Sequence, residues 1–490
     1  MTASVAAALQ KIKAAVGPKG IVEDPAAMEP YLIEQRGYFR GAARLVVRPG
    51  STAEVAQVVR LASQARLPIV PQGGNTGLCG GCVSEGDAIL LNLGRLNRVR
   101  ALDPVDYTIT VEAGCILADI QKAAEAADRL FPLSLGAEGS CEIGGNLSTN
   151  AGGIAVLRYG NTRDLCLGLE VVLPDGQIWD GLRTLRKDNT GYDLKQLFIG
   201  AEGTLGIITA ATLKLFPRPR EVETAFLGLA RASDAMALFA RARAASGDQL
   251  TAFELIPRIG LEFALRHVSG IVDPLTAPHA WYVLLEVSSS RSESHLRQGL
   301  ETLLGDLVEA RLIADGAIAQ SAQQARQLWK IREGMVEAQK FEGASIKHDV
   351  SVAVSRVAEC IERMTAAVKN HSPGCRPVAF GHVGDGNIHF NVSQPLGGDG
   401  KAFLAERETV NDIVHDVVYE MGGSISAEHG IGILKRDELP RYKSAVAIDL
   451  MRNLKRALDP NGIMNPGKIF ALEQPSAPAV PLRRPPKRAG

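Results

Sequence analysis

Apolar residues are spaced for helices at three places in the first quarter of the chain. Between residues 5 and 16 they recur every three to four positions, which is the period of one helix face. Ser51 and Glu54 have the spacing of a capping box, and an apolar face follows them. Residues 116–127 also read as a helix. We therefore expect one helix at the N-terminus, one after Ser51 and one over 116–127.

Short runs of branched aliphatic residues predict strands over residues 67–70, 88–93 and 107–112. A hairpin is expected at residues 169–179, where a Pro-Asp-Gly turn separates two such runs. Helices and strands alternate here, so the first half is expected to be α/β with mixed sheets. Two prolines within residues 216–220 interrupt regular pairing and mark a boundary between the halves.

Three glycine-rich segments, at residues 71–78, 136–153 and 198–209, interrupt these elements. Glycine leaves backbone N–H groups open to close approach, which suits phosphate binding. One such segment is weak evidence, because many glycine-rich turns are only turns, and the first is neither a P-loop nor a Rossmann fingerprint. Three segments in one half of the chain favour an extended dinucleotide threaded through two subdomains.

A second hairpin is expected around Asp385-Gly386, which is the strongest type of short hairpin signal. If these two residues form the loop, His382 faces His389 across the strands, close enough for both imidazoles to bind one metal ion. Asn391 lies two residues past His389 and therefore projects on the same face. The alternative is a surface hairpin with two incidental histidines.

A carboxylate and an imidazole, Glu428 and His429, stand side by side in another glycine-containing stretch near the end of the chain. Two histidines with one carboxylate are a common ligand set for Zn²⁺ that leaves a position open. Adjacent side chains point in different directions, so one can bind metal while the other performs acid–base chemistry. This second motif favours the metal site over the incidental hairpin.

Composition limits the other classes of function. Lys plus Arg and Asp plus Glu both number 54, so no global positive charge is available for binding nucleic acid. The seven cysteines are too scattered for a disulfide scaffold, and Cys79 and Cys82 are expected to be inert thiols. The sequence has neither an apolar run of about 18 residues nor a secretory signal. We expect a cytoplasmic protein, with peripheral contact at a membrane as the alternative.

The three glycine-rich segments resemble, in order over about residues 35–216, the FAD-binding domain of the vanillyl-alcohol oxidase/p-cresol methylhydroxylase flavoproteins. The resemblance implies FAD with its pyrophosphate on the first segment. None of the nine histidines precedes residue 267, so the FAD is expected to be non-covalent. The implied cofactor-binding residues are Pro71, Gly73, Gly74, Asn75, Thr76, Gly77, Leu78, Pro132, Gly136, Ser140, Gly144, Gly145, Asn146, Asn150, Gly152, Gly206, Ile207 and Ile208.

The second half, from about residue 217 to 470, is similar to the C-terminal domain of FAD-linked 2-hydroxyacid dehydrogenases. The motifs at residues 381–391 and 426–432 carry this resemblance. The family includes D-lactate dehydrogenases, the glycolate oxidase flavoprotein subunit and, most similar to this chain, D-2-hydroxyglutarate dehydrogenases. The resemblance implies zinc or another divalent metal on His382, His389 and Glu428, with His429 as the catalytic base.

Further residues are expected to hold the substrate and the flavin. Arg332 and Lys347 match positions that contact the substrate carboxylate, and Asn391 is expected to contact the substrate as well. Asn465 and Lys468 match a C-terminal segment that returns to the flavin. These assignments rest on the resemblance, since isolated charges on a surface are otherwise ordinary.

The expected activity is oxidation of a D-2-hydroxy acid, with D-2-hydroxyglutarate first, to the 2-oxo acid. A metal polarises the hydroxyl group, His429 removes its proton, and hydride passes to flavin N5. Val336 stands where the D-2-hydroxyglutarate enzymes have Thr, so a D-lactate or glycolate dehydrogenase is the alternative. The residues leave the electron acceptor open between an electron-transfer flavoprotein, a quinone and a cytochrome. A homodimer would fit the family.

The expected fold class is α+β, with a two-subdomain FAD-binding domain of the p-cresol methylhydroxylase type and a substrate domain that contains an antiparallel sheet. The expected divisions are an N-terminal helical segment over 1–36, the FAD-binding domain over 37–216, the substrate- and metal-binding domain over 217–455, a segment returning to the flavin over 456–472, and a disordered, basic, Pro-rich tail over 473–490.

Overall fold

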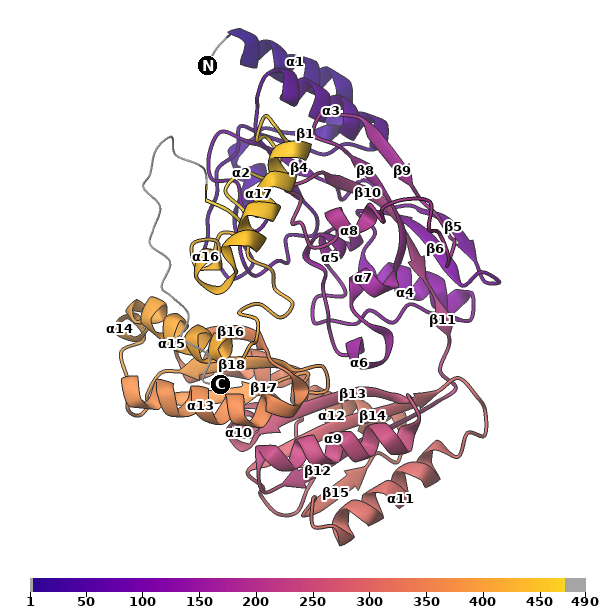
Figure 1. Ribbon diagram of the computed structural model, residues 1–490, viewed down its shortest axis with the longest axis vertical. Helices are drawn as coiled ribbons and strands as arrows, with labels where there is room; N and C mark the ends of the chain where they lie inside the picture. The colour runs from indigo at the N-terminus through magenta and orange to yellow at the C-terminus, as the bar shows by residue number, and fades with distance from the viewer. Residues whose placement is uncertain (1–2, 472–490) are drawn as a thin grey trace.

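The computed structural model describes residues 3–471, which form two stacked halves with an α+β fold (Figure 1). The N-terminal part of the chain builds the half drawn at the top, and residues 221–420 build the lower half. The tail expected over 473–490 lies outside the described residues. Within residues 3–471, no helix combines the length and the apolar character needed to cross a membrane.

The predicted N-terminal helix is α1 (Ala3–Val16), and it packs against α3 (Thr52–Gln64). The Ser51 hydroxyl caps α3 by accepting a hydrogen bond from the Glu54 backbone N–H at 3.2 Å. The Glu54 carboxylate accepts in return from the Gly50 N–H at 2.8 Å, one residue before the expected position. The helix therefore begins where the capping signal predicts.

The first sheet has four strands in the order β1-β2-β4-β3. Strands β2, β4 and β3 run parallel and β1 is antiparallel to β2, so the mixed sheet predicted for this half is confirmed. The elements of this region are η1 (Pro18–Gly20), β1 (Ile21–Val22), α2 (Pro25–Leu32), β2 (Leu45–Val47), β3 (Ile69–Gln72) and β4 (Ile89–Asn92).

The second sheet is antiparallel throughout, in the order β5-β6-β10-β8-β9. Strands β8 and β9 form the predicted hairpin around the Pro-Asp-Gly turn. Its strands are β5 (Val99–Asp103), β6 (Thr108–Glu112), β8 (Cys166–Val172), β9 (Ile178–Gly181) and β10 (Ile207–Lys214). The surrounding elements are α4 (Leu117–Ala126), β7 (Arg129–Leu130), α5 (Ile143–Thr149), α6 (Val156–Tyr159), α7 (Thr162–Leu165), α8 (Lys195–Phe198) and β11 (Phe216–Pro217).

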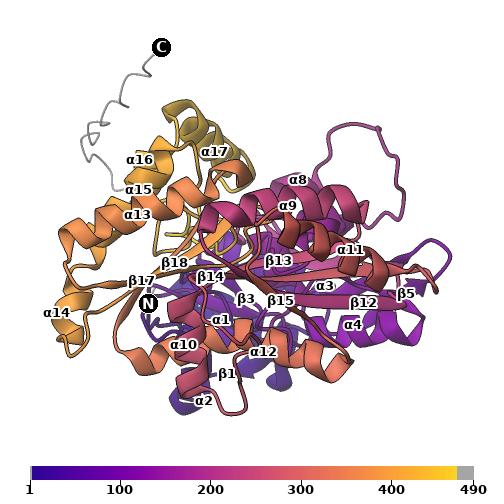
Figure 2. The same ribbon diagram turned by 90° about the horizontal axis from the view of Figure 1, so that it is seen from below.

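The lower half contains an antiparallel sheet in the order β13-β14-β12-β15, seen from below in Figure 2. Alternate residues of β12 point to opposite faces: Ala225 and Leu227 join the core under α9 and α11, and Phe226 joins the core under α10 and α12. The elements are β12 (Glu221–Leu229), α9 (Ala232–Ser246), β13 (Leu250–Pro257), α10 (Arg258–His267), β14 (Trp281–Ser289), α11 (Leu296–Glu309), β15 (Asp315–Ile318) and α12 (Ala322–Ala338).

A smaller antiparallel sheet, β16-β18-β17, lies beside it and carries the site motifs. A bridge between Leu255 of β13 and Gly381 joins the two sheets. The elements are η2 (Gln339–Glu342), β16 (Ser345–Ser351), η3 (Val354–Arg356), α13 (Val357–His371), β17 (Arg376–Phe380), β18 (Asn387–Ser393), α14 (Gly400–Ala405) and α15 (Arg407–Glu420).

The end of the chain returns to the upper half through α16 (Leu439–Tyr442) and α17 (Ala445–Leu458), drawn in yellow in Figure 1. Beyond α17 the chain lies alongside β3: the Ile69 N–H donates to the Ile463 carbonyl and the Asn465 N–H donates to the Ile69 carbonyl, both at 2.8 Å. The first sheet therefore includes backbone pairing from both ends of the sequence.

Candidate active site

A cavity of about 890 Å³ is lined by residues of both halves, including all seven predicted residues of the first glycine-rich segment. The second and third segments contribute eight more of the predicted residues. The lining residues expected to bind cofactor are Pro71, Gly73, Gly74, Asn75, Thr76, Gly77, Leu78, Gly136, Gly144, Gly145, Asn146, Gly152, Gly206, Ile207 and Ile208.

Five predicted cofactor residues do not line this cavity. Asn150 caps the end of α5 in a left-handed conformation, and the Asn465 amide donates to the carbonyls of Gly81 and Glu202. Lys468 is buried with its ammonium 3.6 Å from a Glu85 carboxylate oxygen. The other two are Pro132 and Ser140. The structure gives Asn150, Asn465 and Lys468 packing partners, and a direct contact between any of the five and the flavin stays a prediction.

Glycines in this cavity meet two different needs. A Cβ on Gly74 would lie 2.0 Å from the Ser140 carbonyl oxygen, so only glycine allows the first two segments to approach each other. A Cβ on Gly77, Gly136 or Gly145 would meet nothing within 4 Å, so backbone at these positions borders open space. A cradle of open backbone beside a large cavity fits a bound dinucleotide.

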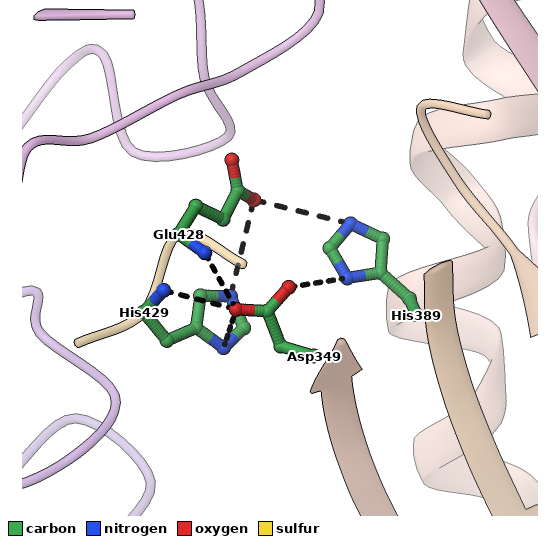
Figure 3. A group of neighbouring side chains, drawn as sticks. All are labelled: Asp349, His389, Glu428 and His429. Carbon is green, nitrogen blue, oxygen red and sulfur yellow. Dashed lines mark hydrogen bonds and ion pairs between the residues drawn. The ribbon is translucent and has the colours of Figure 1, made fainter. Parts of the chain in front are cut away.

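The loop that carries Glu428 and His429 is held by Asp349, at the end of β16 (Figure 3). Both backbone N–H groups, of Glu428 and of His429, donate to Asp349 Oδ2 at 2.9 Å. The Asn387 side chain donates to Oδ1 at 2.9 Å. Asp349 is only 2% exposed, so these bonds replace the water that a carboxylate normally binds.

The same carboxylate faces two imidazoles. Asp349 Oδ1 lies 3.6 Å from Nδ1 of His389, and Oδ2 lies 3.5 Å from Nδ1 of His429. Burial alone would raise the pKa of Asp349, but the nearby His429 and His389 rings and the backbone donors hold that pKa well below its usual value. Burial lowers the pKa of both imidazoles, and the charge of Asp349 opposes that shift.

Glu428 completes the group and connects it to the upper half. Glu428 Oε2 accepts from the Gly153 N–H at 3.0 Å, while Oε1 lies 3.9 Å from His389 Nε2 and 4.0 Å from His429 Nε2. Ligand atoms of Asp349, His389, Glu428 and His429 all lie within 4.8 Å of one another. This donor set of oxygen and imidazole nitrogen fits a divalent metal.

The hairpin register predicted for residues 382–391 is wrong. Phe380, and not His382, pairs with His389. Gly381 leaves the hairpin because it exchanges two backbone hydrogen bonds with Leu255, and the loop therefore runs from residue 381 to residue 386. The two imidazoles nevertheless lie close, with ring centroids of His382 and His389 5.3 Å apart.

His382 is held by a buried carboxylate of β13. Its Nδ1 lies 2.6 Å from Glu254 Oε1, and the other carboxylate oxygen accepts from Arg332 Nε, also at 2.6 Å. Burial would lower the pKa of His382, but the Glu254 charge outweighs it and raises that pKa to about 9. His382 lies outside the group of four in Figure 3, and its role as a metal ligand stays a prediction.

The predicted substrate residues separate into two sets. Lys347 lines the cavity. Val336, which stands where the D-2-hydroxyglutarate enzymes have Thr, also lines it. Arg332 is buried over the Phe380 ring, and the Asn391 side chain donates to the side-chain Oε1 of Gln339 at 2.8 Å; neither Arg332 nor Asn391 lines the cavity. The structure therefore gives Lys347 direct access to the cavity and leaves the contacts of Arg332 and Asn391 with substrate as predictions.

Three buried carboxylates that position the site, Asp349, Glu254 and Glu202, were not singled out from the sequence. Glu202, in the upper half, accepts from the N–H groups of Ile431 at 2.7 Å and Gly432 at 2.8 Å. One signal was available for Asp349, because it lies two residues beyond Lys347 on the same strand face. Glu254 is far from the motifs in sequence, and Glu202 lies within the third glycine-rich segment, where glycine spacing alone does not indicate the partners of a carboxylate.

Cys79 and Cys82 lie beside the cavity as protonated thiols. Burial raises the pKa of each to about 11, and their sulfur atoms donate to Gly430 O and Asn75 Oδ1. A thiol must lose its proton to act as a nucleophile or ligand. The arrangement accords with the expectation of inert thiols.

Comparison with known proteins accounts for both halves. The FAD binding domain family matches residues 43–181, and the family of FAD linked oxidases, C-terminal domain, matches residues 218–469. The chain is 38% identical over 458 residues to the mitochondrial D-2-hydroxyglutarate dehydrogenase of Arabidopsis thaliana, covering 94% of this chain and 80% of that relative. It is 37% identical over 443 residues to the D-2-hydroxyglutarate–pyruvate transhydrogenase of Saccharomyces cerevisiae, covering 88% and 87%.

Among solved structures, p-cresol methylhydroxylase with bound substrate has the same fold, with a TM-score of 0.73 at 16% identity over 96% of this chain and 98% of the other. The p-cresol methylhydroxylase type of FAD-binding domain predicted from the glycine-rich segments is thus confirmed. The chain belongs to the FAD-linked oxidase family, and it is an FAD-dependent oxidoreductase.

Proposed function

We propose that this protein oxidises D-2-hydroxyglutarate to the 2-oxo acid, with non-covalent FAD and a divalent metal. The observation that carries the proposal is the group of Asp349, His389, Glu428 and His429, in which Glu428 and His429 line the same cavity as the glycine-rich segments. The D-2-hydroxyglutarate dehydrogenase relative supports the choice of substrate.

The chain's own residues divide the work. When bound, FAD accepts two electrons and a divalent metal on His382, His389 and Glu428 polarises the substrate hydroxyl. Glu254 fixes Nδ1 of His382 and leaves Nε2 for the metal, which is a common arrangement for ligating histidines. His429 accepts the hydroxyl proton at Nε2. Asp349 lies beside Nδ1 and favours the tautomer that carries its hydrogen on Nδ1, which leaves Nε2 free to accept. The same carboxylate stabilises the imidazolium that forms.

Lys347 binds a carboxylate of the substrate from the cavity wall. The Lys347 ammonium forms no hydrogen bond or ion pair within the described residues, so it is free for a ligand. Burial lowers the pKa of Lys347, which makes a bound anion the natural partner.

Oxidation of D-lactate is the second candidate, and Val336 is the observation that favours it. Its side chain lines the cavity and cannot donate the hydrogen bond that Thr supplies. We predict that V336T increases kcat/KM for D-2-hydroxyglutarate about tenfold or more relative to D-lactate, the contribution of one hydrogen bond to a charged group. Steady-state kinetics on both acids check this prediction, and an equal change on both would contradict it.

The electron acceptor, subunit number and cytoplasmic location stay predictions. An electron-transfer flavoprotein, a quinone and a cytochrome are the acceptors expected from the family. The name of the yeast relative adds pyruvate, a 2-oxo acid, to these candidates.

An anaerobic titration tests the proposal. Purified protein with bound FAD is mixed with D-2-hydroxyglutarate or D-lactate while the flavin absorbance near 450 nm is followed. Bleaching by D-2-hydroxyglutarate at low concentration, abolished by a metal chelator and restored by Zn²⁺, is the expected result. Bleaching only by D-lactate would favour the second candidate. Absence of bleaching by both acids in flavin- and metal-loaded protein would refute both.

A further inference from the structure

A tight turn from the N-terminal part of the chain reaches the cavity between the two halves. The turn spans residues 33–40: Ile33 and Arg40 pair as an isolated bridge, and the Gly37 N–H donates to the Glu34 carbonyl at 2.8 Å. Gly37 has a φ of +71°, which suits glycine at the end of the turn. Arg36 lies at its tip.

Contacts from both halves hold this turn. From the upper half, the Asn75 side chain donates to the carbonyls of Ile33 at 2.8 Å and Pro30 at 3.2 Å. From the lower half, the Arg407 guanidinium stacks over the Tyr38 ring at 4.5 Å. The tip is therefore anchored on both sides of the position where Arg36 meets the cavity.

Arg36 lines the cavity together with Lys347 and His429. Its positive charge lowers the pKa of Lys347, second only to burial, and also acts on His429, so the three groups share one region. Within residues 3–471 Arg36 makes neither a hydrogen bond nor an ion pair to a side chain. Of the other cations near the site, Lys340 pairs with Glu337 at 2.7 Å and Arg332 pairs with Glu254.

Two unpaired cations that face one cavity repel each other unless an anion lies between them. Of the acids that line the cavity, Glu428 and Glu202 accept from backbone N–H groups and Glu337 pairs with Lys340. Glu142 also lines the cavity, but within the described residues none of these four carboxylates forms an ion pair with Arg36 or Lys347. A free guanidinium beside a free ammonium matches a carboxylate, which the guanidinium binds through two parallel hydrogen bonds.

We propose that Arg36 is a specificity-determining residue: with Lys347 it binds the carboxylate of a dicarboxylic 2-hydroxy acid that is remote from the reacting carbon. The proposal rests on the proposed function, since it assumes oxidation at the carbon that bears the hydroxyl. It adds a residue of the N-terminal segment to a site otherwise built from the FAD-binding and substrate domains.

The test compares two substrates of equal length, D-2-hydroxyglutarate and D-2-hydroxyvalerate, which differ by the remote carboxylate. In R36Q, KM for D-2-hydroxyglutarate should rise about tenfold or more, the loss expected for a charge-assisted hydrogen bond, while kcat/KM for D-2-hydroxyvalerate stays within about twofold. R36K should recover part of the loss, because lysine restores the positive charge but not the two parallel N–H donors of the guanidinium. R40Q is the matched control, because Arg40 is on the same turn and pairs with Glu29 at the surface.

Other outcomes overturn the proposal. An equal loss on both substrates would make Arg36 a structural residue, and loss of bound FAD from R36Q would assign its guanidinium to the cofactor's phosphates. A wild-type enzyme that oxidises neither acid would refute the proposed function itself, and the wild-type measurement alone reveals that case. An R36Q enzyme indistinguishable from wild type on the dicarboxylate would refute only the role of Arg36.

Discussion

Two buried carboxylates, one from each half of the molecule, hold the loop that carries His429, the proposed catalytic base. Asp349 from the lower half accepts the N–H groups of residues 428 and 429, and Glu202 from the upper half accepts those of residues 431 and 432. Their backbone bonds are alike, yet the pKa of Asp349 is lowered and that of Glu202 is raised.

The difference lies in what else each carboxylate faces. Two imidazoles stand 3.5–3.6 Å from Asp349, whereas Glu202 has only more distant lysines to offset its burial. Asp349 therefore acts on the charge of the His389 and His429 side chains, whereas Glu202 fixes only the position of the loop. The comparison predicts unequal costs for the two neutral substitutions.

The largest effect is expected for D349N. The amide keeps the size of the side chain but removes the charge that orients and stabilises His429, so flavin reduction should slow by about 10²–10⁴-fold. Anaerobic stopped-flow absorbance measures this rate. D234N is the matched control, because Asp234 is also buried in the lower half, where it caps α9 away from the cavity. A slowing of less than threefold would remove the distinction between Asp349 and Glu202.

The next effect concerns Glu254, a third buried carboxylate, which faces His382 and Arg332. E254Q should weaken the affinity for the divalent metal by about 10–100-fold, because the group that orients a ligating imidazole is lost. Competition with a chromogenic chelator measures the dissociation constant. An unchanged constant would place His382 outside the metal site.

E202Q should have a smaller effect, lowering kcat by about tenfold with little change in KM, since Gln retains one acceptor for the two N–H groups. E112Q serves as control, because Glu112 is a buried carboxylate of the same half that pairs with Arg98 and Arg100. If E202Q lowered kcat by as large a factor as D349N slows flavin reduction, the position of the loop, and not the charge of Asp349, would dominate the reaction.

Glu142 tests the electrostatic side of the comparison through the pH dependence of stability and not through the reaction rate. It lines the cavity without a cation at contact distance, and burial raises its pKa to about 8. Because that pKa exceeds the unfolded value, folded protein retains a proton that the unfolded chain has lost, and stability falls with rising pH between about 5 and 8. E142Q should remove this fall, which is on the order of 1 kcal/mol per pH unit. Urea unfolding of flavin-free protein at pH 5, 6 and 7 measures it.

Sequence reasoning located the site's motifs because glycine spacing and His-Glu chemistry are local. The structure places residues of the three glycine-rich segments, Glu428 and His429 along one cavity. Sequence reasoning failed on the pairing of His382, because the backbone of Gly381 bonds to Leu255, more than a hundred residues earlier. A local hairpin preference could not include that competing partner.

The same reason explains why Glu202 and Arg36 were missed. Arg36 belongs to no motif, and Glu202 lies in the third glycine-rich segment, where glycine spacing gives no reason to single out a carboxylate. Each gains its role only when the two halves come together around residues 426–432. Lys347, by contrast, lies on a short strand whose alternation places it and Asp349 on one face.

The pairing of β3 with the residues after α17 bears on how the protein is made. The strand at residues 69–72 is synthesised long before its backbone partners at 463–465. The substrate domain lies wholly between these two segments, so it can fold as a unit before β3 gains its backbone partners at 463–465. The first sheet of the flavin-binding half thus gains its last backbone partners only after the whole substrate domain has been synthesised.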